Sequence, residues 1–177
     1  MEKGLVHVYT GDGKGKTTAA FGLALRAYEN GMRVCIIQFL KPSPSGEARF
    51  IEGLNVARFR VLRFERAHGF TYDPASKQTK ALREDTVSAL AFIKTLYTEQ
   101  VCDLLVLDEV ICSHQLGLIS KEELCSLIEH KPHGCELVLT GRGAPDWLVV
   151  LADYVTNMTL VKHPFQDGTD ARRGIEY

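Results

Sequence analysis

The sequence predicts a single α/β domain with a mostly parallel central sheet and helices on both of its faces. Short apolar runs alternate along the chain with segments in which apolar residues recur at helical spacing. Two runs, residues 34–39 (VCIIQF) and 104–107 (LLVL), are almost continuously apolar, which is typical of strands buried on both faces. A length of 177 residues suits one domain, and no repeat or linker divides residues 1–177.

The expected elements follow from apolar spacing and from residues that begin or end an element. Ser120 and Glu123 form a capping box at the start of a short helix, and Gly31 ends the first helix. Residues 41–46 are rich in proline, serine and glycine, which indicates a loop. The predicted strands cover residues 5–9, 34–39, 58–64, 104–107, 136–140 and 154–161, and the predicted helices cover residues 17–30, 74–98, 110–116, 120–130 and 145–152.

Composition and charge argue against several classes of protein. The net charge of −1 offers no bulk attraction to nucleic acid or to an anionic membrane. No apolar run approaches the length of a membrane span, and the first strand follows the N-terminus too closely for a signal peptide, so we expect a cytoplasmic protein. The five cysteines form no C-x-x-C pair, which favours reduced thiols.

One group of metal-binding residue types lies near the predicted fifth strand: Cys125, His130, His133 and Cys135. Zinc is one interpretation of this group, but the spacing matches no familiar zinc motif. The other interpretation is structural, because His130 falls in the last turn of a helix, where a histidine suits the dipole, and His133 belongs to a turn. We favour the structural interpretation.

A glycine-rich segment after the first strand carries the clearest functional signal. Residues 10–18 read T-G-D-G-K-G-K-T-T and lead directly into the first predicted helix, which is the layout of a phosphate-binding P-loop. The glycines allow successive backbone N–H groups to point into one concavity, and the helix start adds its positive dipole end. Lys16 supplies a charge for phosphate, and Thr17 supplies a hydroxyl for Mg²⁺. A solvated glycine-rich turn is the alternative, and this order of residues disfavours it.

This P-loop departs from the usual pattern at one position. In the pattern G-x-x-x-x-G-K-S/T, counting back from Gly15 places Thr10 where the first glycine normally stands. We nevertheless expect the whole loop to bind a nucleotide. Its predicted nucleotide-binding residues are Thr10, Gly11, Asp12, Gly13, Lys14, Gly15, Lys16, Thr17 and Thr18.

Polar residues at the ends of other predicted strands complete the candidate site. Asp108 and Glu109 follow an apolar strand, as do carboxylates that hold Mg²⁺ beside a P-loop, although an acid that merely caps the next helix is the alternative. Further nucleotide-binding candidates follow other strands: Gln38, Lys41, Gly141 and Arg142. The planar fork of Arg142 suits phosphate oxygens, whereas a solvated surface arginine is the alternative. Because carboxyl ends of parallel strands meet at one edge of a sheet, we expect these residues to converge.

Over essentially its full length the chain resembles the cytosolic ATP:corrinoid adenosyltransferases, which are built on a RecA-like P-loop fold. A P-loop without its first glycine is what this family has. Together with this loop, the other matching segments make the resemblance highly specific. They are residues 38–41 (QFLK), 69–72 (GFTY), 107–109 (LDE), 140–143 (TGRG), 161–165 (VKHPF) and 174–177 (GIEY).

The resemblance implies an unusual reaction for a P-loop protein. A Co(I) corrinoid would attack the 5′ carbon of ATP and release the whole triphosphate. The implied catalytic residues are Lys16 and Arg142, which would stabilise charge on the triphosphate, and Glu109, which would position the nucleotide or the metal ion. The implied Mg²⁺ ligands are Thr17, Asp108 and Glu109.

The resemblance also implies corrinoid-binding residues and partners. Phe70 and Tyr72 match the positions that line the corrin, and Tyr72 stands where the best-known pattern has tryptophan. Lys162, Arg172 and Arg173 would either meet corrin amides or carboxylates or belong to a solvated tail. An external reductant, such as a reduced flavoprotein, would supply the electron that produces Co(I). Two chains would form a homodimer.

Two other functions share the same motifs. A RecA-like ATPase would hydrolyse ATP at this site, although a nucleic-acid motor needs a basic surface that the net charge does not suggest. A nucleotide-gated protein could bind a corrinoid without turnover. Longer members of the family carry an N-terminal extension that could cover the site, so we expect the 42–49 loop or a partner subunit to close it in this chain.

Overall fold

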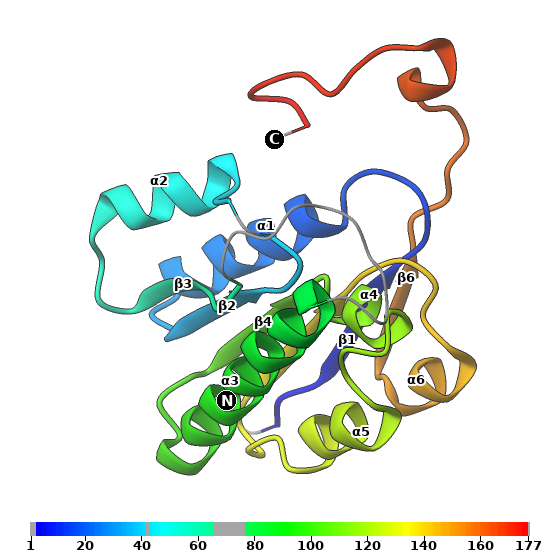
Figure 1. Cartoon of the computed structure of the whole chain (residues 1–177). Helices are drawn as coiled ribbons and strands as arrows, with labels where there is room; N and C mark the ends of the chain where they lie inside the picture. The colour runs from blue at the N-terminus through cyan, green and yellow to red at the C-terminus, as the bar shows by residue number, and fades with distance from the viewer. Residues whose placement is uncertain (1–2, 42, 66–76, 177) are drawn as a thin grey trace.

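A central sheet organises the computed structural model, which describes residues 3–41, 43–65 and 77–176 (Figure 1). Within these residues the strands are β1 (Val6–Thr10), β2 (Val34–Gln38), β3 (Phe59–Arg63), β4 (Leu104–Asp108), β5 (Glu136–Thr140) and β6 (Tyr154–Asn157). They lie in the order β3-β2-β4-β5-β1-β6, and every neighbouring pair is parallel. β5 therefore lies between the P-loop strand β1 and the acid-bearing strand β4, as in RecA-like folds.

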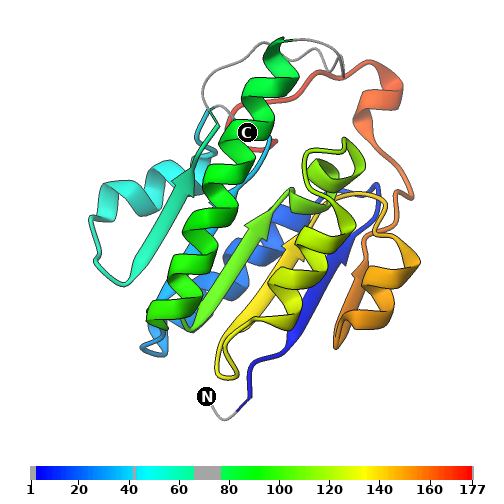
Figure 2. The same cartoon turned by 60° about the horizontal axis from the view of Figure 1, so that its bottom comes forward.

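Helices cover both faces of this sheet. The described helices are α1 (Lys16–Glu29), α2 (Gly46–Leu54), α3 (Lys77–Glu99), α4 (Val110–Gln115), α5 (Lys121–Glu129) and α6 (Asp146–Leu151), with a 3₁₀ turn, η1 (Pro164–Asp167), near the C-terminus. α1 and α2 lie on one side of the sheet, and α3, α4 and α5 lie on the other (Figures 1 and 2). Successive strand residues alternate between the two cores, so that Ile36 packs on the α1 side and Ile37 on the α3 side. No helix in the described ranges is both long and apolar enough to cross a bilayer.

The predicted fold class is confirmed by this layered arrangement. The almost continuously apolar runs of β2 and β4 are buried at every position, because helices cover both faces. The predicted capping box is also present at the start of α5. Glu123 N donates to Ser120 Oγ at 3.1 Å, and Ser120 N donates to Glu123 Oε2 at 2.8 Å.

Two elements differ from the sequence predictions. α2 forms where no helix is predicted: Ser45 caps it by accepting from Ala48 N at 3.3 Å, and Ala48 and Ile51 are buried on the α1 side. The helix is short and contains two glycines, so its local helix propensity is low and the sequence does not predict it. Packing and capping stabilise it instead. The last strand ends at Asn157, earlier than predicted, and the carbonyl of Met158 instead accepts a hydrogen bond from the P-loop.

The strand register brings the predicted site residues to one edge of the sheet. Gln38 at the end of β2 is the register partner of Asp108 at the end of β4. Tyr9, next to the last residue of β1, is paired with Thr140 at the end of β5. The P-loop, the acidic pair and the loop after Thr140 therefore meet at the carboxyl end of the sheet, as predicted.

Candidate nucleotide-binding site

The loop between β1 and α1 depends on glycines in the left-handed region. Gly11 has a φ of 99° and Gly15 a φ of 120°, values that residues with a Cβ adopt only with strain. Gly15 is also the N-cap of α1, and as a glycine it has no side chain to occupy the N–H groups of the first turn. The loop therefore presents the kind of helix start that binds phosphate.

The segment that follows β6 packs directly against this loop. Gly13 N donates to Met158 O at 2.7 Å, and a Cβ on Gly13 would lie 2.6 Å from the same oxygen. A Cβ on Gly11 would overlap Asn157 Oδ1 and lie 2.5 Å from Met158 O. Both glycines are therefore required by a close tertiary contact that the local motif does not reveal.

Replacing Gly11 with alanine is expected to lower the free energy of unfolding by about 2 kcal/mol or more, because the methyl group combines an unfavourable φ with steric overlap. The displaced loop should also bind ATP more weakly. Gly22→Ala is the matched control, since Gly22 lies in α1 and a Cβ there would have no neighbour within 4 Å. Chemical denaturation and ATP titration compare the two variants, and wild-type stability of Gly11→Ala would contradict the prediction.

Lys16 is buried at the centre of the loop. Only 8% of the residue is exposed, and its Nζ donates to Gly11 O at 2.6 Å and to Gly13 O at 2.8 Å. Burial lowers the pKa of this ammonium group, and the nearby charge of Glu109 partly opposes that shift. The loop thus holds one cation among the backbone groups that a P-loop uses to bind phosphate.

Asp108 is fully buried and accepts hydrogen bonds from four side chains. Its Oδ1 accepts from Thr17 Oγ1 at 2.9 Å and from Thr140 Oγ1 at 2.8 Å. Its Oδ2 accepts from Gln38 Nε2 at 3.1 Å and from Lys41 Nζ at 2.5 Å. One ammonium group and three neutral donors therefore offset the cost of burying this carboxylate.

The oxygens of this cluster suit a magnesium ion. Thr17 Oγ1 and Asp108 Oδ1 lie 2.9 Å apart beside the P-loop, and hydroxyl and carboxylate oxygens are ligands that Mg²⁺ prefers. Lys41 Nζ lies 3.2 Å from Thr17 Oγ1 and also contacts Asp108, so the cluster already attracts a cation to this point. A metal ion that binds both oxygens would share or replace the contacts of Lys41.

Glu109 belongs to the cleft. It has a φ of 63° and occupies the N-cap position of α4, but its side chain makes no capping hydrogen bond. Its backbone N–H donates to Thr140 Oγ1 at 2.9 Å, which fixes the backbone. The side chain lines the same cleft as Lys16 and Arg142. Glu109 therefore stands at the N-cap of α4 without a side-chain capping hydrogen bond, and it also lines the cleft.

The loop after β5 is packed tightly against α4. Gly141 has a φ of 146°, and a Cβ there would lie 2.7 Å from Ile111 Cβ and 2.9 Å from Cys112 N. The backbone N–H of Arg142 donates to Cys112 Sγ at 3.3 Å. The exposed Arg142 lines the cleft, so this tightly packed loop presents an exposed guanidinium beside the P-loop.

Thr10 occupies the position of the missing first glycine and makes a contact that glycine cannot make. Its hydroxyl accepts a hydrogen bond from Ala144 N at 3.0 Å. Thr10 itself is buried at the end of β1. The variant residue therefore ties the P-loop strand to the loop that carries Arg142.

Together these elements line a cleft of about 1190 Å³. The predicted nucleotide- and metal-binding residues among its lining are Asp12, Gly13, Lys14, Gly15, Lys16, Thr17, Thr18, Lys41, Glu109 and Arg142. Five other predicted residues do not line the cleft but hold the lining segments in place through the contacts described above. They are Thr10, Gly11, Gln38, Asp108 and Gly141. Of the predicted corrinoid-binding residues, Lys162 is exposed and is not part of the lining, and Phe70 and Tyr72 lie outside the described residues.

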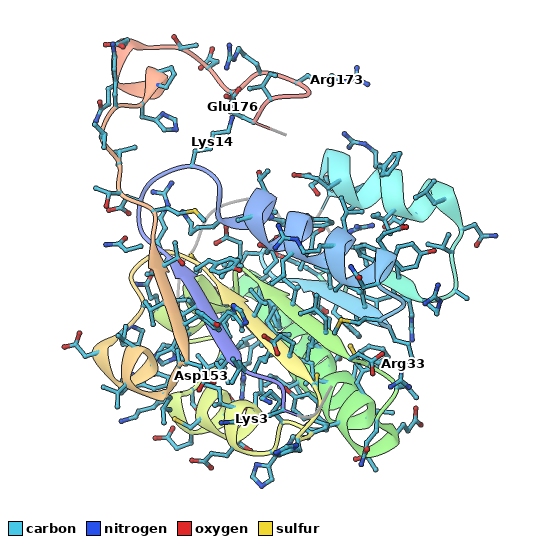
Figure 3. All side chains as sticks on the ribbon, turned by 180° about the vertical axis from the view of Figure 1, so that it is seen from behind. Lys3, Lys14, Arg33, Asp153, Arg173 and Glu176 are labelled. Atoms are coloured by element: carbon cyan, nitrogen blue, oxygen red, sulfur yellow. The ribbon has the colours of Figure 1, made fainter. Side chains whose placement is uncertain are left out.

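The C-terminal segment forms a wall of this cleft. The sequence alone leaves open whether this segment contacts a substrate or is a solvated tail. Lys14 Nζ donates to Ile175 O at 2.9 Å and to Glu176 Oε1 at 3.0 Å (Figure 3). Arg172 binds Glu176 as well, and this contact, together with Lys14, lowers the pKa of Glu176 to about 2. No local pattern could have predicted an ion pair between residues 162 positions apart in the chain. α2, which contributes Phe50 to the lining of the same cleft, is the other part of the cleft that the sequence does not reveal.

Two of the four histidines and cysteines near β5, His130 and Cys135, make structural contacts. His130 is the C-cap of α5, and its Nδ1 lies 2.9 Å from Ser126 O. Cys135 is buried in the core on the α3 side of the sheet. In the part of the chain that the structure describes, no three His, Cys, Asp or Glu side chains are grouped so that they could hold a metal ion.

The fold and the site together define a nucleotide-binding protein of the RecA-like P-loop class. The sequence matches the model of one family, "ATP:corrinoid adenosyltransferase BtuR/CobO/CobP", over residues 2–177. The chain therefore belongs to the ATP:corrinoid adenosyltransferase family, and the resemblance stated from its motifs is confirmed.

Individual relatives support the same assignment. The "Corrinoid adenosyltransferase" of Escherichia coli (strain K12) is 37% identical over 179 residues, which is 99% of this chain and 87% of the relative. The corresponding protein of Salmonella typhimurium is 36% identical over 180 residues, again 99% of this chain and 87% of the relative. That of Pseudomonas aeruginosa is 34% identical over 178 residues, covering 99% of this chain and 85% of the relative.

Proposed function

We propose that this protein transfers the 5′-deoxyadenosyl group of ATP to the Co(I) centre of a corrinoid and releases triphosphate. The observation that carries the proposal is the match to the adenosyltransferase family over residues 2–177, in a chain whose P-loop lines a large cleft. In the reaction, the electron pair of Co(I) forms a bond to the 5′ carbon. The bond between that carbon and its oxygen breaks, and its electron pair leaves with the triphosphate.

The residues of the site would act mainly on the leaving group. Co(I) is a strong nucleophile and needs no base, so Glu109 would position the nucleotide or its metal ion rather than activate water. Lys16 and Arg142 would stabilise the charge that collects on the triphosphate. The P-loop backbone would hold the 5′ carbon in line with cobalt by fixing the phosphates.

Mg²⁺ would be held by the oxygens of Thr17 and Asp108, with Glu109 nearby. When bound, the ion would neutralise part of the triphosphate charge. Gln38 and Thr140 would keep the Asp108 carboxylate in place through their hydrogen bonds to it. Lys41, which donates to Asp108 and lines the cleft, would contact the phosphates when the ion is bound.

The corrinoid would be bound in part by Phe70, Tyr72 and Lys162, as the family resemblance implies. An external reductant, such as a reduced flavoprotein, would convert Co(II) to Co(I), because the sequence carries no motif for a haem, flavin or iron–sulfur group. We further propose that the protein works as a cytoplasmic homodimer. These assignments follow from the family and from the chain's composition.

One assay tests the proposed function against its rivals. The protein is incubated under anaerobic conditions with ATP, Mg²⁺ and chemically reduced cob(I)alamin, and the absorbance of the adenosylated product and the released phosphates are measured. We expect adenosylcobalamin and free triphosphate in equal amounts. ADP and orthophosphate without a change in the corrinoid spectrum would indicate an ATPase, and binding without either product would indicate a carrier protein.

A further inference from the structure

The cleft beside the P-loop has two chemically different halves. The polar half contains the P-loop with Lys41, Glu109 and Arg142. The other half is built by side chains from α1, α2 and the C-terminal segment. These are Phe21, Leu25, Phe50, Ile51 and Ile175, which we call the apolar wall. Because a triphosphate needs only the polar half, the apolar wall calls for a different ligand group.

Three members of the apolar wall are exposed although they are large and hydrophobic: Leu25, Phe50 and Ile175, of which Ile175 is 57% exposed. On α2, Ala48 and Ile51 are buried on the α1 side of the sheet, whereas 60% of Phe50 is exposed. Leu25 on α1 is 44% exposed. Apolar side chains placed in a concave site and left in water provide the surface that an apolar ligand covers with a gain in free energy.

Size and position separate the apolar wall from the phosphate site. Leu25 lies eight residues after Thr17 in the same helix, which corresponds to about 12 Å along the helix axis. The cleft of about 1190 Å³ also exceeds the roughly 300–1,000 Å³ of a pocket for one small ligand. The cleft is therefore larger than one small ligand needs, and it extends beyond the phosphate site along α1.

The border of the apolar wall is polar. Residues Ser43, Ser45, Glu47 and Arg49 line the cleft next to Phe50. A corrin ring has broad apolar faces and carries amide groups around its edge, which both donate and accept hydrogen bonds. This chemistry matches an apolar centre that is bordered by hydroxyl, carboxylate and guanidinium groups. The adenine ring is smaller and would cover only part of the apolar wall.

We propose that the apolar wall binds one face of the corrin ring, with Phe50 as its main contact. This proposal rests on the function proposed above and names the part of the cleft that receives the second substrate. α2 supplies a helical support for the ring, because Ala48 and Ile51 anchor it to the sheet and Ser45 caps its start. The residues of the apolar wall are different from Phe70 and Tyr72, the corrin-lining positions that the family resemblance implies.

The test compares two truncations on the same helix. Phe50→Ala removes the main contact, and Leu54→Ala is the matched control, because Leu54 is 48% exposed on α2 but does not line the cleft. Binding of cob(II)alamin is measured by equilibrium dialysis, and binding of ATP with Mg²⁺ by calorimetry. We expect Phe50→Ala to raise the Kd for the corrinoid about tenfold or more while the Kd for ATP stays unchanged. Leu54→Ala should leave both constants unchanged.

The outcomes distinguish this proposal from its alternatives. An unchanged corrinoid Kd in Phe50→Ala, or an equal rise in Leu54→Ala, would overturn it. A raised Kd for ATP with an unchanged Kd for the corrinoid would assign the wall to adenine and would also overturn it. Failure of the wild-type protein to adenosylate cob(I)alamin would count against the proposed function alone, because the binding measurements need no turnover.

Discussion

Replacing Lys16 with alanine is expected to reduce adenosyl transfer by about 10³-fold, the scale seen when one preorganised group that stabilises transition-state charge is removed. The ammonium group is buried in the P-loop and donates to Gly11 O and Gly13 O. Its loss would remove the positive charge beside the departing triphosphate and would also loosen the loop backbone. The rate is measured from pre-reduced cob(I)alamin, so that reduction of cobalt does not limit it.

Lys14→Ala is the matched control for this effect. Lys14 belongs to the same loop and carries the same charge, but its side chain is half exposed and binds Ile175 O and Glu176 at the surface of the cleft. We expect this variant to lose far less activity than Lys16→Ala. Circular dichroism verifies that both variants are folded. Comparable losses in the two variants would show that the buried position of Lys16 has no special role.

Replacing Asp108 with asparagine is expected to lower the free energy of unfolding by about 3 kcal/mol and to abolish the Mg²⁺ dependence of ATP binding. The side chain is fully buried, and the amide nitrogen that replaces one oxygen could no longer accept the hydrogen bonds made there. If it replaces Oδ2, it meets Gln38 Nε2 and Lys41 Nζ; if it replaces Oδ1, it meets Thr17 and Thr140. The ammonium of Lys41 would also lose its ion pair.

Asp103→Asn provides the control, because Asp103 pairs with Arg33 at the opposite end of β4. That pair is at the surface, with 32% and 44% of the two side chains exposed, and we expect its loss to cost less than about 1 kcal/mol. Urea denaturation gives the unfolding free energies, and calorimetry with and without Mg²⁺ gives the affinities for ATP. Asp108→Asn with wild-type stability and Mg²⁺-dependent binding would refute both parts of the prediction.

The sequence predicts those parts of the site that consist of consecutive residues. The P-loop of residues 10–18 is recognisable because strand, glycines, lysine and helix start follow one another directly. Asp108 and Glu109 are recognisable because they end an apolar run. The hydroxyl of Thr10 was not predicted to reach Ala144, since the two residues are 134 positions apart and no local pattern joins them.

The elements that escaped prediction are those whose stability comes from distant parts of the chain. α2 carries only Ala48 and Ile51 as buried residues, which is too short a signal to separate a helix from a loop. The last strand ends at Asn157, and the carbonyl of the next residue accepts a hydrogen bond from Gly13 N, which nothing near residue 158 indicates. The ion pair between Lys14 and Glu176 likewise cannot be predicted from either segment alone.

By itself the sequence determined the fold class, the nucleotide-binding loop, the acidic pair and the family, because apolar periodicity and motif spacing are properties of short segments. Only the tertiary structure decided that Thr17, Gln38, Lys41 and Thr140 converge on Asp108, and that α2 and the C-terminal segment line the same cleft. The physical reason is the parallel sheet, which brings the ends of strands distant in sequence to within hydrogen-bonding distance of one another.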